Sequence, residues 1–469
     1  MRTGVQMDVV DEYTGAKLGD ARLDARLVSS ARMVAGKPDS SFPKAAGSDA
    51  ELEATYRFLN NERVGPDAML GPHVRQTVLR ASACETVVIA HDTSEFNFGA
   101  SRRDDLGFVA QGESYGFFGH FALAVEANEA RTPLGVVAHE MIRRDQKRKT
   151  KSEKTAKDNP SNEFHRWGRV VDVAQQTLAS MRPIHVMDRE ADSYELMARL
   201  VDAGARWVIR LSQSTRRVST ESASVGEIIE RARATVHRDV PLTARARSPL
   251  PKQRKTHPAR DARLARLEAS ATTVTIKRPH SSKASQPETL TLNVVRVFEP
   301  EPPNGETPIE WRLWTTEPVS TEAEILAVID AYRCRWRIEE FFKALKTGCA
   351  IEKRQLESFR GLANTVALMV PVAWRLLRLR TLAREQGHLP ATHALTARQL
   401  RCLAGALRKR GRPRLPQAPT VRDAMLGVAA LGGHIRNNGE PGWIVLGRGF
   451  DDLLLLELGY LLATEDDEM

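Results

Sequence analysis

Three acidic residues occupy positions where a carboxylate could do metal chemistry. Asp92 ends the apolar, β-branched run 86–92, and Asp188 ends a similar run at 183–188. Such runs predict buried strands, each with an acid at its end. Taken singly, each aspartate is more often a helix N-cap or a turn residue. A buried carboxylate without a partner is costly, however, so these two aspartates together with Glu339 on a helix indicate a site for one or two Mg²⁺ ions.

Four residues around the last of these acids share a helical spacing, because they are three, four and seven positions apart. They are Tyr332, Arg335, Glu339 and Lys346. At about 100° per residue, all four project from one stripe of a single α-helix. A solvated helix with ordinary Glu–Arg pairs is the more common origin of such a stripe. The two strand-end aspartates favour instead a helix that holds a divalent cation and contacts nucleic-acid phosphates.

Three motifs occur in the order found in a known family. They are Asp92-Thr93-Ser94, then Asp188-Arg189-Glu190-Ala191-Asp192, then the complete set Tyr332, Arg335, Glu339 and Lys346. Over nearly its whole length the sequence resembles the DDE transposases of bacterial insertion sequences, in the insertion-sequence-four group that includes the transposase of transposon five.

The resemblance implies an α/β, ribonuclease-H-like catalytic core whose catalytic residues and metal ligands are Asp92, Asp188 and Glu339. Mg²⁺ is the expected cofactor, and Mn²⁺ is expected to substitute for it. The implied activity is cut-and-paste DNA transposition, in which a nick at the element's end is followed by hairpin formation, hairpin opening and strand transfer. The implied partners are double-stranded DNA, both terminal inverted repeats and target, and a second subunit in a homodimer on paired ends.

The resemblance also implies which residues contact the nucleic acid. The expected phosphate contacts are Tyr332, Arg335, Lys343, Lys346 and, more weakly, Arg189 and Arg210. The two weaker candidates could equally form surface salt bridges. Trp311 would stack on a base flipped out of the duplex, an interaction worth about 1–3 kcal/mol that requires no sequence readout. Core packing of Trp311 or Trp314 in a strand pair is an equally good alternative.

Composition agrees with a polyanionic partner. The 469 residues include 69 Lys and Arg against 59 Asp and Glu, which gives a net charge of +10 and a pI near 9.5. The apolar, uncharged run 361–374 is shorter than the roughly 18 residues of a membrane span, and the acidic N-terminus is unlike a signal sequence. Four scattered cysteines argue against a zinc site and a disulfide framework. We therefore expect a reduced cytoplasmic protein on the bacterial nucleoid, without a membrane partner.

The chain is expected to form three regions. Residues 1–75 predict a helical module that, by resemblance, binds the transposon end. Residues 76–384 predict the catalytic domain, in which three strands are followed by a helix, a strand, a helix, a strand and then the Glu339 helix. This domain is expected to contain a β-rich insertion at 213–317 and a basic loop at 143–162 that DNA could order. Residues 385–469 predict a helical dimerisation domain whose apolar last helix, around 453–462, must be covered.

Two alternatives stay open. A catalytically inert relative could occupy transposon ends without cutting them, although all three acids are present here. A nuclease or junction resolvase could share the ribonuclease-H-like fold, although such proteins lack the β-rich insertion and the stripe from Tyr332 to Lys346.

Overall fold

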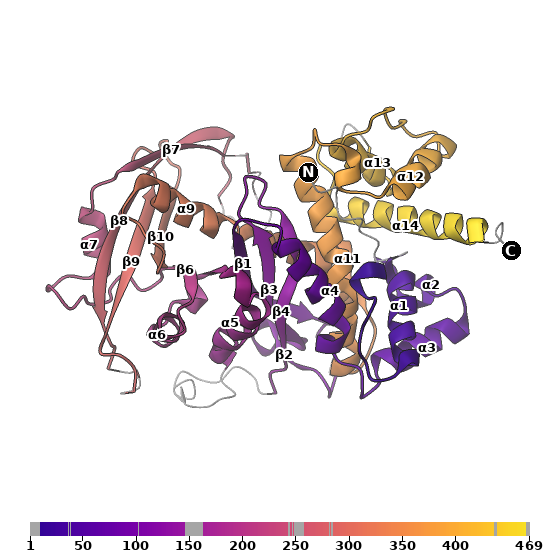
Figure 1. The fold of residues 1–469 in the computed structure, drawn as a ribbon, viewed down its shortest axis with the longest axis horizontal. Helices are drawn as coiled ribbons and strands as arrows, with labels where there is room; N and C mark the ends of the chain where they lie inside the picture. The colour runs from indigo at the N-terminus through magenta and orange to yellow at the C-terminus, as the bar shows by residue number, and fades with distance from the viewer. Residues whose placement is uncertain are drawn as a thin grey trace. The chain divides into compact units, whose positions relative to one another are not determined.

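The computed structural model describes residues 10–35, 37, 39–101, 103–145, 163–242, 244–245, 247, 258–280, 282, 285–435 and 439–465. Its elements are a mixture of helices and strands, so the fold class is α/β. They form two compact units, which we call the first unit (Met1–Pro183 with Trp336–Met469) and the second unit (Ile184–Arg335). Figure 1 shows the elements of both.

The N-terminal part of the first unit is helical. Its helices are η1 (Val10–Glu12), α1 (Ala21–Ala35), α2 (Phe42–Ala45), α3 (Asp49–Leu59) and α4 (Pro66–Ala81). Buried charges fasten it to the strands that follow. The Glu12 carboxylate lies 2.6 Å from Arg80 and 2.5 Å from His73, whose other ring nitrogen accepts the Val136 N–H. Burial raises the pKa of Glu12, but His73 and Arg80 lower it more, to about 2, so this carboxylate is ionised.

Four antiparallel strands form the sheet of the first unit: β1 (Val87–Asn97), β2 (Gly107–Val109), β3 (Ser114–Glu126) and β4 (Pro133–Ile142). β3 pairs with the other three, so β1, β3 and β4 form the predicted meander. The expectation that Asp92 ends its strand was wrong. The pairing of β1 with β3 continues five residues further, to Asn97 opposite Gly116. Gly116 permits this close approach, because a Cβ there would lie 1.9 Å from the Phe96 carbonyl oxygen.

The remaining helices of the first unit are α5 (Arg166–Thr177), α10 (Trp336–Lys343), α11 (Phe359–Glu385), α12 (Ala397–Lys409), α13 (Val421–Leu431) and α14 (Trp443–Glu465). α5 packs on β3 and β4, and α10 packs on β1. α11 has the length and apolar composition of a membrane span, but 94% of that apolar window is buried in the protein. It runs beside α4 as the central helix of this core (Figure 1).

Glycines let α13 and α14 pack at very short range. A Cβ at Gly449 would lie 1.7 Å from the Val428 carbonyl oxygen, and a Cβ at Gly432 would lie 2.0 Å from that of Val445. Both positions therefore require glycine. Their contact fixes the first half of α14, where Leu446, Phe450 and Leu453 are buried.

The second unit begins with the parallel strands β5 (Ile184–Met187) and β6 (Arg206–Arg210), joined by α6 (Tyr194–Asp202). The later elements are α7 (Val225–Arg231), β7 (Val236–Leu242), β8 (Arg263–Lys277), β9 (Thr289–Phe298), β10 (Glu310–Thr315) and α9 (Glu322–Arg333). The strand order is β5-β6-β10-β9-β8-β7. The strands predicted within 213–317 are thus confirmed, and they extend the sheet through the antiparallel pairing of β10 with β6.

Short helical turns connect these elements: η2 (Ala110–Gly112), η4 (Glu163–His165), η5 (Ala179–Met181), η6 (Arg189–Ala191), the π-helical turn η7 (Ala344–Gly348), η8 (Ile351–Lys353) and η9 (Ala391–His393). Most of the expected basic loop, residues 146–162, lies outside the described residues.

The prediction of one helical stripe from Tyr332 to Lys346 was wrong. α9 ends at Arg333 and α10 begins at Trp336, because Arg335 donates its N–H to the carbonyl of Tyr332, three residues back, and tightens the turn. Lys346 then lies in the π-helical turn η7. The break also divides the set between the two units.

Candidate active site

Asp92 and Glu339 lie on the same side of the first unit's sheet. Asp92 is directly opposite Phe121 in the antiparallel register, so the two side chains point to the same face. The Phe121 ring lies 5.8 Å from that of Phe341 and 5.9 Å from that of Phe342, both on α10. Asp92 therefore faces the helix that contains Glu339, and both acids are only partly buried.

The opposite face of β1 has a polar network that sequence reasoning missed, centred on Thr93, the residue after Asp92. The Thr93 hydroxyl lies 2.8 Å from His120 Nδ1 and accepts a hydrogen bond of 2.9 Å from Arg166. Burial, with the charges of Arg166 and Arg169, lowers the pKa of His120 well below its ordinary value, so this ring is neutral. The register of β1 with β3 places His120 opposite Thr93. In the sequence, only the alternation of side chains along β3 could have suggested this contact.

Asp188 directly follows β5, as predicted, and belongs to the second unit. One of its carboxylate oxygens accepts the Glu190 N–H at 2.9 Å, which caps the turn η6. The parallel register pairs Met187 with Ile209, so Asp188 and Arg210 are the next residues on neighbouring strands. The second acid and this arginine thus lie side by side at the ends of neighbouring strands.

Arg210, Trp311 and Tyr332 form a cluster beside Asp188. The rings of Trp311 and Tyr332 are 5.5 Å apart in an edge contact, and the Arg210 guanidinium lies 5.7 Å from the Trp311 ring. Burial raises the pKa of Tyr332, as does the nearby charge of Asp188, while Arg335 and Arg210 lower it. Burial also lowers the pKa of Arg210, with Arg189 acting in the same direction.

Six of the predicted site residues therefore come together within the second unit, namely Asp188, Arg189, Arg210, Trp311, Tyr332 and Arg335. The two tryptophans of β10 differ in environment. Trp314 is fully buried core, whereas Trp311 is only partly buried.

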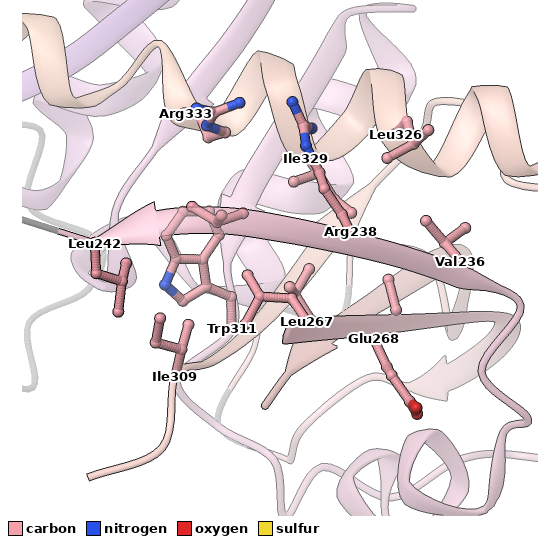
Figure 2. Close-up of a pocket in the computed structure, with 13 residues that line it drawn as sticks. Val236, Arg238, Leu242, Leu267, Glu268, Ile309, Trp311, Leu326, Ile329 and Arg333 are labelled. Atoms are coloured by element: carbon pink, nitrogen blue, oxygen red, sulfur yellow. The ribbon is translucent and has the colours of Figure 1, made fainter. Parts of the chain in front are cut away.

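Trp311 also borders an apolar pocket between α9 and the sheet of the second unit. The pocket has a volume of about 100 Å³ and is lined mainly by aliphatic side chains. Figure 2 shows Trp311 beside Leu242 and Ile309, with α9 across the pocket. Arg238 and Arg333 lie at the pocket and share one carboxylate oxygen of Asp330, at 2.7 and 2.8 Å. The indole therefore has an apolar face toward the pocket in addition to its edge contact with Tyr332.

The two predicted lysines of the first unit differ. Lys343 is exposed at the end of α10. The Lys346 ammonium donates to the Glu95 carbonyl on β1, forms an ion pair of 3.3 Å with Glu352, and lies over the Phe96 ring. Lys346 thus fastens η7 to the strand that contains Asp92.

The three acids suit a hard divalent cation, because each of them offers carboxylate oxygens as metal ligands. Asp92 and Glu339 belong to the first unit and Asp188 belongs to the second. Among the described residues, no group of three His, Cys, Asp or Glu side chains is close enough to hold a metal ion. The assignment of all three as ligands of one site therefore stays a prediction.

A second hollow, of about 430 Å³, lies between α1 and α3 in the N-terminal helices. Its charged lining is mainly basic and consists of Arg22, Arg26, Arg57 and Arg63, with Asp20 as the acid. Four guanidinium groups around one hollow suit a nucleic-acid backbone. Sequence reasoning named this module without finding the hollow, although the spacing of Arg22 and Arg26 places them on one helix face.

Two protein families match parts of this chain. Residues 9–64 match the family described as transposase DNA-binding, and residues 136–372, just over half of the chain, match the transposase DDE domain. The second match contains Asp188 and Glu339 and begins after Asp92. A cryo-EM structure of the piggyBac transposase synaptic complex with hairpin DNA is similar with a TM-score of 0.37 and 9% identity, over 78% of this chain and 67% of that one. The chain therefore belongs to the family of transposases with a DDE domain.

Proposed function

We propose that this transposase belongs to the insertion-sequence-four group, with a ribonuclease-H-like core, and moves its element by nicking, hairpin formation and strand transfer. The observation that supports this most strongly is the cluster around Asp188. There the second acid, the tyrosine and arginine of the third motif, and the tryptophan of the β-rich insertion lie together in one unit. A nuclease or resolvase without the insertion has no counterpart of this tryptophan.

Asp92, Asp188 and Glu339 would hold the divalent metal, with Mg²⁺ as the proposed ion and Mn²⁺ as a substitute. When bound, the ions would activate water or a 3′-hydroxyl and stabilise charge on the attacked phosphodiester. The chain's own groups then orient the DNA. Arg210 and Arg335, which lie near Asp188 and Tyr332, neutralise phosphates, and exposed Lys343 adds a further cation.

The decisive experiment incubates the purified protein with its flanking inverted repeats and Mg²⁺. A hairpin product on a denaturing gel supports the proposal. Specific end binding without any cleavage in Mg²⁺ or Mn²⁺ would favour the inert end-binding protein. Cleavage without a hairpin, on branched or unrelated DNA, would favour a nuclease.

Trp311 should matter more to the hairpin than to the first nick, because stacking is needed only when a base leaves the duplex. Trp311→Ala is expected to slow hairpin formation by about 10–100-fold more than nicking, from the loss of about 1–3 kcal/mol. Single-turnover gels would resolve the two steps. Trp311→Phe is the matched control, since it retains an aromatic face and should keep most of the rate. An equal loss of rate in nicking and in hairpin formation would indicate that Trp311 serves only in packing.

The arginine hollow between α1 and α3 is proposed to hold the backbone of the transposon end. Arg26→Ala with Arg63→Ala should weaken end binding and reduce the slope of log affinity against log salt by about 2, since each phosphate contact contributes about one unit. Fluorescence anisotropy at several salt concentrations measures this. Arg32→Ala, an exposed arginine of α1 outside the hollow, is the control. A double variant with the wild-type slope would exclude the hollow from the interface.

A further inference from the structure

Asp192 is a buried carboxylate whose two oxygens are both occupied by protein donors. Its side chain has no exposed surface. One oxygen accepts the backbone N–H groups of Ser212 at 2.6 Å and Gln213 at 2.9 Å, and also the Ser212 hydroxyl at 3.0 Å. The other lies 2.8 Å from the Arg216 guanidinium. With these donors around it, Asp192 is not available as a metal ligand, although it belongs to the same motif as Asp188.

The contacts of Asp192 join two chain segments at the ends of neighbouring strands. Asp192 ends the turn η6, which begins directly after Asp188. Ser212 lies two residues after Arg210, and the register of β5 and β6 places Asp188 and Arg210 at equivalent positions. Asp192 therefore fastens the chain beyond the second acid to the chain beyond the arginine, within one unit.

The negative charge of Asp192 is essential to this arrangement. Its carboxylate compensates the Arg216 guanidinium, whose side chain is 8% exposed, and accepts two backbone N–H groups at once. An asparagine has the same shape but only one carbonyl oxygen. If that oxygen accepts from the two amides, the NH₂ group faces the guanidinium. If the oxygen faces the guanidinium, the NH₂ group faces the amides. Removing one partner of such a buried pair leaves the other charge uncompensated.

We propose that Asp192 is a positioning residue that fixes Asp188 relative to Arg210 and thereby sets the metal affinity of the second acid. This inference rests on the proposed function, in which Asp188 is a metal ligand. Groups that orient a ligand from behind typically change metal affinity or activity by about 10–100-fold when they are lost. The effect should therefore appear in metal binding, not only in stability.

The test measures Mn²⁺ binding by full-length protein on end DNA, from the electron paramagnetic resonance signal of free Mn²⁺. Asp192→Asn should bind Mn²⁺ about 10–100-fold more weakly than wild type, and saturating Mn²⁺ should restore cleavage to within a few-fold. Asp202→Asn, an exposed acid at the end of α6, is the matched control and should bind normally. Wild-type Mn²⁺ affinity in a folded Asp192→Asn protein would overturn the inference, as would lost cleavage that no Mn²⁺ concentration restores.

Ser212→Ala provides a milder variant should Asp192→Asn fail to fold. It removes one hydrogen bond without uncovering a charge, so about threefold weaker Mn²⁺ binding is expected. Unchanged binding would contradict the inference. Asp188→Asn in the same titration separates the two proposals. If Asp188→Asn does not change Mn²⁺ binding, the assignment of Asp188 as a metal ligand is wrong and the inference about Asp192 fails with it. If Asp188→Asn weakens Mn²⁺ binding but the Asp192 and Ser212 variants do not, only the role of Asp192 is rejected.

Discussion

Replacing any one of the three acids by its amide is expected to abolish DNA cleavage while leaving end binding within a few-fold of wild type. Asp92→Asn, Asp188→Asn and Glu339→Gln keep the size of each side chain but remove the charge that a divalent cation requires. All three side chains are partly exposed, so their loss leaves the buried cores intact. Cleavage of labelled end DNA in Mg²⁺, together with anisotropy for binding, gives both readouts.

Glu322→Gln is the matched control for the acid variants, because Glu322 is an exposed acid in the first turn of α9. It should cut at the wild-type rate. If one of the three amide variants cuts in Mg²⁺ as fast as this control, that residue is not a catalytic acid. Asp92 is the sharpest case, since it lies outside the segment that matches the DDE domain.

Charges on the outer face of α14 are expected to abolish the paired-end complex and with it all double-strand cleavage. A cut-and-paste enzyme must bring two ends together, and we propose that a two-fold pair of subunits does so through this face. Leu455, Leu456 and Tyr460 are exposed there by 47%, 37% and 42%. Leu455→Glu with Tyr460→Glu should leave binding to a single end unchanged, because the arginine hollow between α1 and α3 is untouched.

Light scattering with and without end DNA measures the pairing, and a two-end cleavage assay measures its consequence. Point substitutions are preferable to deleting the C-terminal region, because the first half of α14 packs on α13 and on η7, the turn that contains Lys346. Ile444→Glu, at an exposed position near the start of the same helix, tests whether any charge on α14 has the effect. A Leu455/Tyr460 variant that still pairs two ends and cuts both would exclude this face from the interface.

Local patterns were enough to predict most strands and the candidate acids. The apolar run before Asp188 ends as a strand at Met187, and the β-rich insertion contains strands where β-branched residues alternate. These features depend on neighbouring residues, so they are visible in a single sequence. The proximity of Asp188 to Arg210, by contrast, depends on the parallel pairing of β5 with β6, which no local pattern specifies.

What the sequence alone determined about this protein is the identity of its chemical groups: three acids, a tryptophan in the insertion, and a net charge of +10. The tertiary structure decided where elements end and which groups support the acids. β1 continues past Asp92 because β3 supplies partners as far as Asn97, and the helix after Tyr332 breaks at Arg335. The hydrogen-bond donors that hold the buried Asp192 carboxylate lie 20 to 24 residues further along the chain. Such partners are brought together only by folding, so no local pattern specifies them.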